Sequence, residues 1–222
     1  MKRVNVMIFV SDRVETLVDE LGSGRCVLLL GEYRGAAAHL VLAAAAADTA
    51  TVAFLVRHGS GFLEVAMPEA RCDQLCIPAM WDGVPTAGPA YGVSVDLAGS
   101  DGTGISARDR AATIRRLADP AARHGDFTRP GHVVPVRVPA TDSAEYSGAA
   151  YVAMALAHLA TGRAACVVTA VPSVHNPAEL ADADEIHAFG AAHGLSVCGI
   201  SEVSGRNLRL AAEQNYLLYT NR

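Results

Sequence analysis

The run from Asp101 to Pro120, DGTGISARDRAATIRRLADP, gathers the residue types that hold anions. Gly102 and Gly104 allow backbone angles that are closed to other residues, and Ser106 stands where a helix N-cap belongs, three residues before Asp109. The first N–H groups of a helix, with hydroxyls and an arginine nearby, can bind a phosphate or a carboxylate. Most helix starts are only capped, so the alternative is a run that forms a turn and a helix without holding a ligand.

Glu64 is the carboxyl best placed for acid–base chemistry, because it lies among apolar neighbours in the stretch GFLEVAM. Burial raises the pKa of a carboxyl and suits it to proton transfer near neutral pH. The alternative is a glutamate at a strand edge that points to water. The sequence supports both interpretations.

The five cysteines give no sign of a disulfide framework or a metal site, because they form an odd set without paired metal-ligand spacing. Cys26, Cys166 and Cys198 lie inside apolar runs, where thiols are commonly buried and inert. Cys72 and Cys76 are one helical turn apart without a neighbouring histidine pair, which favours packing. We therefore expect no metal and no other cofactor on these residues.

Strands and helices that alternate along the chain must position these side chains. Such alternation is typical of an α/β layered fold. Strands are expected at 25–31, 39–47, 60–67, 91–97, 131–138, 164–171 and 195–200. Helices are expected at 11–21, 47–59, 68–75, 107–119, 148–162 and 177–194. With 222 residues and 51% hydrophobic content, we expect a single domain over residues 1–222.

Charge and hydropathy exclude two classes of partner. The net charge of -5 and a pI near 5.9, with scattered basic residues, argue against nucleic acid and anionic lipid. Apolar runs such as VLAAAAA are far shorter than the roughly 20 residues that span a bilayer. Polar residues interrupt the apolar stretch at the N-terminus before a signal-peptide cleavage site, so we expect a cytoplasmic protein with no membrane partner.

The run VSVDLAGSDGTGISARDRAATIRRLADP, continued by GDFTRPGHVVPV, resembles the signature of 3,4-dihydroxy-2-butanone 4-phosphate synthase. This riboflavin-pathway enzyme converts ribulose 5-phosphate to a four-carbon ketone phosphate and formate. The resemblance implies a three-layer α/β sandwich and a homodimer with its sites close to the subunit interface. The matching positions are Asp96, Thr103, Gly104, Ser106, Asp109, Arg110, Thr113, Asp126, Arg129, Pro130, Gly131 and His132.

The chain departs from the family pattern at the family's acidic loop, D-D-x-D-R-E-N-E-G-D, whose carboxylates bind a divalent metal and handle substrate protons. The equivalent stretch here is LGEYRGAAAH, in which Arg34 alone stays in register. Gly35 replaces the metal-binding glutamate, Ala37 the later glutamate and His39 the final aspartate. The resemblance therefore implies that the metal-binding loop has been lost.

A second family element, R-x-G-H-T-E, supplies an arginine for phosphate and a histidine for metal. It aligns with YSGAAY at residues 146–151, so the arginine, the histidine, the threonine and the glutamate are absent. The family's downstream strand glutamate falls near Thr169. Glu64 stands where the family commonly has a cysteine that faces the substrate cleft.

These substitutions predict a repurposed enzyme that needs no metal and acts on a weakly polar small molecule in accessory or secondary metabolism. The expected chemistry is proton transfer, as in isomerisation, dehydration or cyclisation. The catalytic candidates are Glu64, His39 and His132, and the substrate-binding candidates are Arg34, Tyr33, Asp96, Thr103, Ser106 and Tyr151. The alternative is a non-catalytic protein that binds a small molecule or a partner, and retained synthase activity is the least favoured interpretation.

Overall fold

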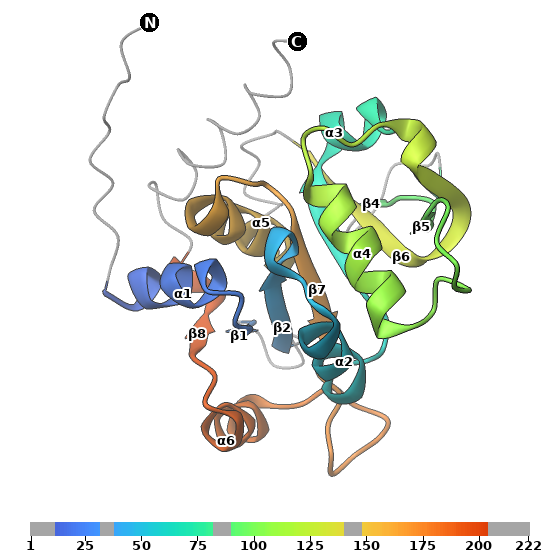
Figure 1. The fold of residues 1–222 in the computed structure, drawn as a ribbon. Helices are drawn as coiled ribbons and strands as arrows, with labels where there is room; N and C mark the ends of the chain where they lie inside the picture. Colours follow the sequence, from blue (N-terminus) through green and yellow to red (C-terminus); the bar gives the residue numbers. More distant parts are fainter. Residues whose placement is uncertain (1–11, 32–37, 82–89, 140–147, 204–222) are drawn as a thin grey trace, which may run out of the picture.

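The computed structural model of the protein describes residues 12–31, 38–81, 90–139 and 148–203 (Figure 1). A mixed eight-stranded sheet runs through it in the order β4-β6-β3-β7-β2-β1-β8, and β5 pairs with β6 away from this path. The strands are β1 Val27–Leu30, β2 Ala38–Ala43, β3 Glu64–Pro68, β4 Ala90–Tyr91, β5 Val95–Leu97, β6 Phe127–Val138, β7 Cys166–Ala170 and β8 Val197–Gly199.

Helices cover both faces of this sheet (Figure 1). The α-helices are α1 Asp12–Gly22, α2 Thr49–His58, α3 Glu69–Gln74, α4 Ala107–Ala118, α5 Ala149–Thr161, α6 Ala183–His193 and α7 Ile200–Val203. Short 3₁₀ helices span Ala44–Ala46 and His124–Asp126. None of the helices in the described segments is long and apolar enough to cross a bilayer.

Two hydrophobic cores, one on each face, hold the helices to the sheet. Residues of α2, α3, α4 and α6 pack with one set of strand side chains, which includes Leu40 and Val65. Residues of α1, α5 and α7 pack with the alternate set, which includes Val41 and Ala66. Successive strand residues point to opposite faces, so β2 and β3 contribute to both cores. The expected α/β layered fold is therefore confirmed.

Several expected elements differ from the structure at their boundaries. The strands expected at 60–67 and 131–138 begin at Glu64 and at Phe127. The helix expected at 177–194 begins at Ala183, because Asp182 and Glu185 form a capping box there. The strand expected at 91–97 is two strands, which pair with different parts of β6. The strand expected at 39–47 ends at Ala43 and continues as a 3₁₀ turn of alanines.

The topology gathers the candidate residues at one end of the strands. We call this end, where β2 and β3 begin and β7 ends, one edge of the sheet. β3 runs parallel to β6, and both β2 and β3 run antiparallel to β7. The first residues of β2 and β3 therefore share an edge with the last residues of β7. α5 leads into β7 from the opposite edge, so the N-terminus of α5 lies at the same edge as Glu64 and His39.

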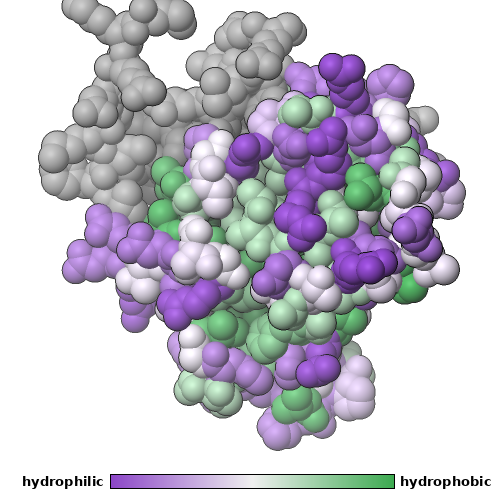
Figure 2. All heavy atoms as spheres, viewed as in Figure 1, coloured by the Kyte–Doolittle hydropathy of each residue, from purple (hydrophilic) through white to green (hydrophobic). Residues whose placement is uncertain are grey.

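The face of the molecule drawn in Figure 1 carries mixed side chains. Hydrophilic residues gather where α3 and α4 lie, and apolar residues lie among polar ones elsewhere (Figure 2).

Candidate functional site

A four-residue excursion in β6 positions His132. β5 pairs with Phe127 and Thr128 and then with Val133, so residues 129–132 bulge out of the ladder. A Cβ on Gly131 would lie 2.0 Å from the carbonyl carbon of Val95 and 2.3 Å from the backbone nitrogen of Asp96. Only a glycine can lie so close to the backbone of β5. This close approach brings the next residue, His132, to Asp96.

Asp96 and His132 form a carboxylate–imidazole pair. The backbone N–H of His132 donates to Asp96 Oδ1 at 2.9 Å, and His132 Nδ1 lies 2.7 Å from Asp96 Oδ2. An ionised carboxylate only accepts hydrogen bonds, so Nδ1 donates in this pair and Nε2 is left to act on a ligand. The side chain of Asp96 is 12% exposed and that of His132 is 39% exposed. The carboxylate is therefore mostly buried, and the imidazole is accessible to solvent.

The glycine-rich loop closes on this pair from the other side. A Cβ on Gly104, whose φ is +86°, would lie 2.1 Å from Asp96 Oδ2. Arg110 of α4 is buried at 7% exposure, and its charge interacts with that of Asp96. Burial lowers the pKa of Arg110 while the nearby Asp96 raises it. The loop and α4 therefore hold Asp96 in place.

Ser106 and Thr103 take different places in this loop. Ser106 Oγ accepts the backbone N–H of Asp109 at 3.0 Å, so the predicted N-cap of α4 is confirmed. Thr103 and Ser106 are both exposed. Their contact with a substrate stays a prediction, because Ser106 already has this structural task and Thr103 faces solvent.

Glu64 begins β3 in the interior of the sheet, opposite Val134 on one side and Val168 on the other. Tyr91 Oη donates a hydrogen bond to Glu64 Oε1 at 3.2 Å. Burial raises the pKa of Glu64, and the hydrogen bond from Tyr91 partly opposes this rise. Glu64 is thus a half-buried carboxyl in the middle of the sheet, as the first of the two sequence interpretations expects.

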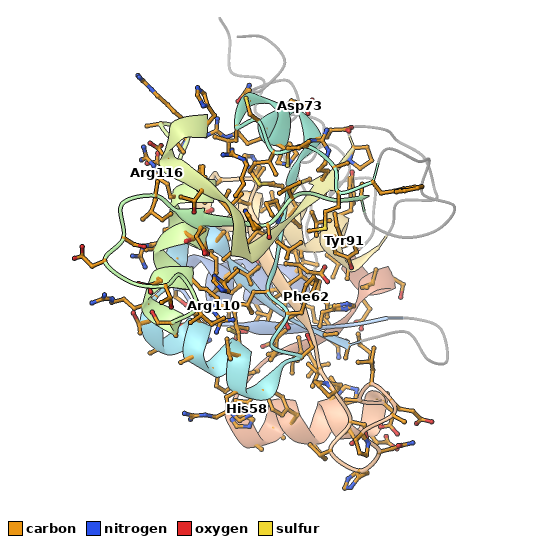
Figure 3. The ribbon with its side chains drawn as sticks, turned by 90° about the vertical axis from the view of Figure 1, so that its right-hand side faces the viewer. His58, Phe62, Asp73, Tyr91, Arg110 and Arg116 are labelled. Carbon is orange, nitrogen blue, oxygen red and sulfur yellow. The ribbon has the colours of Figure 1, made fainter. Side chains whose placement is uncertain are left out.

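Tyr91 is a member of this site that the sequence analysis missed. It lies on β4 opposite Val136, and its ring meets that of Phe62 edge-on at a centroid distance of 6.0 Å (Figure 3). Burial and the charge of Glu64 raise the pKa of Tyr91 to about 12. No local pattern signals this contact, because it depends on the register of β4 and β3 on opposite sides of β6.

His39 lies on the same face of the sheet as Glu64 but two strands away. It pairs with Ala170 of β7, whereas Glu64 pairs with Val168 of the same strand. Strand spacing and rise place the two Cα atoms about 12 Å apart. A direct contact would require both side chains to extend toward each other, so their partnership in proton transfer stays a prediction.

The remaining candidates lie at the start of α5 or outside the described residues. Tyr151 is half-buried in the first turn of α5 and packs against the core that α1 and α5 share. Gly148 is the N-cap of α5 and supplies no side-chain cap. Tyr33 and Arg34 lie outside the described residues.

Four cysteines are buried: Cys26, Cys166 and Cys198, as expected, and also Cys72. Cys76 is exposed, so the expectation that it packs with Cys72 is wrong. Burial raises the pKa of Cys26 to about 12 and also raises the pKa of Cys166 and Cys198, so these thiols resist ionisation. Across residues 12–31, 38–81, 90–139 and 148–203, no group of three or more His, Cys, Asp or Glu side chains is placed to hold a metal ion.

The chain resembles proteins of known name over most of its length. The family model described as 3,4-dihydroxy-2-butanone 4-phosphate synthase matches residues 15–205. Riboflavin biosynthesis protein RibBA of Rhodococcus jostii and its namesake of Mycobacterium marinum are each 39% identical over 194 residues, which are 86% of this chain and 46% of theirs. The chain thus spans about half the length of these relatives.

Solved structures give the same result for the fold. A 3,4-dihydroxy-2-butanone 4-phosphate synthase described in complex with two magnesium ions has a TM-score of 0.76 and 32% identity, covering 85% of this chain and 93% of that one. The synthase of Candida albicans has a TM-score of 0.74 and 31% identity, covering 85% and 94%.

These relatives overturn the expected function. We expected a repurposed enzyme of accessory or secondary metabolism, with a ligand-binding protein as the alternative, yet relatives at 39% identity are named for riboflavin biosynthesis. That expectation rested on two short motifs, whereas the likeness to the family extends over residues 15–205.

The family model covers residues 15–205, and the Asp96–His132 pair lies within the signature shared with the family. The chain therefore belongs to the 3,4-dihydroxy-2-butanone 4-phosphate synthase family.

Proposed function

We propose that this chain catalyses the reaction for which its family is named, the conversion of ribulose 5-phosphate to a four-carbon ketone phosphate and formate. The observation that carries the proposal is the Asp96–His132 pair, in which a buried carboxylate fixes an exposed imidazole at one edge of the sheet. The relatives at 39% identity support it, since they are named for the pathway to which this reaction belongs.

The reaction passes through an enediol, so it needs groups that take and return protons next to the substrate carbonyl. In our proposal His132 is one such group. Asp96 keeps the proton on Nδ1, and Nε2 is then free to accept a proton from the substrate and to give it back. A histidine is suited to this task because one ring nitrogen can accept a proton while the other carries one.

Glu64 is the second proton-transfer group in this proposal. Its carboxyl lies at the same edge of the sheet, two residues along the ladder from the end of the His132 excursion, because Glu64 pairs with Val134. Burial raises its pKa, which brings the carboxyl closer to the pH at which a general acid or base works best. His39 is a further candidate on the same face.

The substrate phosphate is assigned to the N-terminus of α5. This helix has 13 residues, and its N-cap, Gly148, has no side chain that could cap the first turn. Such N–H groups and the helix dipole favour a phosphate. In this proposal Tyr151, Thr103 and Ser106 line the substrate cleft, and Tyr33 and Arg34 contribute from a segment outside the described residues.

Magnesium is the metal that the family resemblance and the name of one similar structure imply. A hard divalent cation takes several oxygen ligands. The described residues do not fit it, because they bring no three ligand side chains together, Asp96 is bonded to His132, and Ala149 stands where the resemblance places a histidine ligand. Glu32, Asp142 and Glu145 are carboxylates of segments outside the described residues. The proton transfers assigned to His132 and Glu64 therefore use side chains alone.

We further propose that this member of the family holds its substrate with a divergent set of side chains. Gly35, Ala37 and His39 stand in place of family carboxylates, and residues 146–151 replace the family's R-x-G-H-T-E element. The proposal also includes the homodimer that the resemblance implies. Light scattering on the purified chain would then give twice the mass of 23.1 kDa, and a monomer mass would contradict it.

The experiment that tests the proposed function is formate release from ribulose 5-phosphate by the purified full chain, with and without added magnesium. The expected result is steady formate release that His132→Asn lowers by at least about 100-fold, the lower limit of what a general acid–base group contributes. The matched control is His124→Asn, since His124 is an exposed histidine near the same strand. Native protein that releases no formate under either condition contradicts the proposal.

A further inference from the structure

Tyr91 and Glu64 form a second hydrogen-bonded pair at the candidate site, apart from Asp96 and His132. The phenol oxygen of Tyr91 lies 3.2 Å from Glu64 Oε1 and donates to it. In the part of the chain that the structure describes, the side chain of Glu64 makes no second hydrogen bond. One carboxyl oxygen is thus held by Tyr91, and the other is left to meet a ligand.

The fold fixes Tyr91 independently of Glu64. Its backbone carbonyl accepts the N–H of Met80 at 2.8 Å, and it pairs with Val136 in the ladder between β4 and β6. Its ring meets Phe62 edge-on and packs against the core beneath α5 (Figure 3). Because ring and backbone are held from several sides, the hydroxyl is a fixed point from which the longer glutamate side chain is oriented.

We propose that Tyr91 is a positioning residue that holds and aims the carboxyl of Glu64 through the hydrogen bond of its hydroxyl. The proposal rests on the proposed function for its catalytic meaning. Its physical content, an oriented carboxyl whose proton affinity depends on one phenol, is independent of any reaction.

The hydrogen bond geometry determines the direction in which Tyr91 shifts the pKa of Glu64. A hydrogen bond from Tyr91 stabilises the carboxylate more than the carboxylic acid, so it holds the pKa of Glu64 below the value that burial alone would give. In return, the charge of Glu64 raises the pKa of Tyr91. The two titrations are coupled, and removal of either partner must move the other in a known direction.

Other titratable groups share this edge of the sheet and must be kept apart in the measurement. They are His39 on β2, His132 on β6 and Tyr151 on α5. Glu64 pairs with Val134 and Val168 in its ladder, so its two direct neighbours in the sheet carry no charge. Tyr151 offers the matched control, because it is a half-buried tyrosine at the same edge.

The test is an NMR titration of the full chain labelled with ¹³C at glutamate side chains, with Glu64→Gln used to assign the Glu64 carboxyl signal. In Tyr91→Phe the titration midpoint of Glu64 is expected to move to higher pH than in the native chain. In Tyr151→Phe it is expected to stay where it is. A Tyr91→Phe midpoint that is unchanged or lower overturns the proposal.

A second measurement serves if Tyr91→Phe does not fold. With ¹³C-labelled tyrosine, Glu64→Gln is expected to lower the pKa of Tyr91 from about 12, because the neighbouring negative charge is gone. An unchanged Tyr91 midpoint in Glu64→Gln overturns the proposal.

Activity then separates this inference from the proposed function. If the native chain releases formate, Tyr91→Phe is expected to lower kcat/KM roughly tenfold and to move the pH–rate profile to higher pH. A profile that does not move refutes the positioning role while the proposed function stands. If the native chain releases no formate but the two titrations are coupled, the proposed function fails and the oriented carboxyl remains.

Discussion

Replacement of Asp96 by asparagine tests how the histidine of the site is controlled. Asp96 accepts two hydrogen bonds from His132, at 2.9 Å from the backbone N–H and 2.7 Å from the ring. Asparagine keeps one oxygen for the backbone N–H, but its amide group can only donate. The amide would then donate to Nδ1, and the proton of the imidazole would move to Nε2.

The magnitude follows from these two contacts. A hydrogen bond to a charged group contributes about 1.5–3 kcal/mol and a neutral one about 0.5–1.5 kcal/mol, so the loss of charge assistance costs roughly 1–2 kcal/mol of stability. The buried Arg110 also loses its negative neighbour, which places the expected cost at the upper end of this range. Because Nε2 can no longer accept a proton, kcat/KM is expected to fall by at least about 100-fold.

The assay is a ¹⁵N spectrum of the histidine rings, which distinguishes the two tautomers, together with chemical denaturation and formate release. Asp101→Asn is the matched control, since Asp101 is an exposed carboxylate of the same loop. It should leave all three readouts unchanged. If Asp96→Asn keeps the native tautomer and loses less than threefold in kcat/KM, then Asp96 does not control His132 and our reasoning is refuted.

Three further predictions follow from the same structure. Gly131→Ala places a Cβ 2.0 Å from Val95 and should lower the free energy of unfolding by at least about 2 kcal/mol. Gly125→Ala is the control, because a Cβ there has no neighbour within 4 Å and should change the free energy of unfolding by less than about 0.5 kcal/mol. Equal effects of the two variants in urea denaturation would refute the close approach of Gly131 to β5. Burial raises the pKa of Glu64, so the folded state keeps its proton to higher pH than the unfolded state and loses stability as pH rises. Glu64→Gln should therefore gain stability relative to the native chain as pH rises above 4.5, the ordinary pKa of glutamate, and a constant difference would contradict this. Burial, His193 and Arg57 lower the pKa of His58 from 6.5, so the free energy of unfolding falls as pH drops below 6.5. His58→Gln should make the free energy of unfolding, measured by denaturation at pH 5 and pH 7, depend less on pH. An unchanged pH dependence would contradict this prediction.

The sequence predicts the layered fold because its elements carry strong local signals. Ser106 caps α4, Asp48 caps α2 and Gly162 ends α5 in the left-handed conformation, and each stands at the boundary where its residue type is favoured. Local signals fail to predict an element's boundary where contacts between distant segments determine it. Residues 177–182 look helical in isolation, but Glu185 accepts hydrogen bonds from Ser173 Oγ and the N–H of Val174, and this holds the preceding segment as a loop.

The candidate site is predicted in part for the same reason. Glu64, His39 and His132 lie toward one edge of the sheet, and their role in a common site stays a prediction. The Asp96–His132 bond depends on a four-residue bulge, and the Tyr91–Glu64 bond depends on strand register. Local sequence patterns predict neither hydrogen bond, because both depend on pairing between segments that are distant along the chain.

The central claim is that this chain performs the family's reaction with a histidine held by Asp96. The most direct measurement is ¹³C NMR of uniformly labelled ribulose 5-phosphate incubated with the purified chain. Our account predicts that a formate signal grows in equal amount with a four-carbon product, and that Asp96→Asn slows both together. Labelled substrate that stays intact with the folded native chain, in the presence and absence of magnesium, would contradict it.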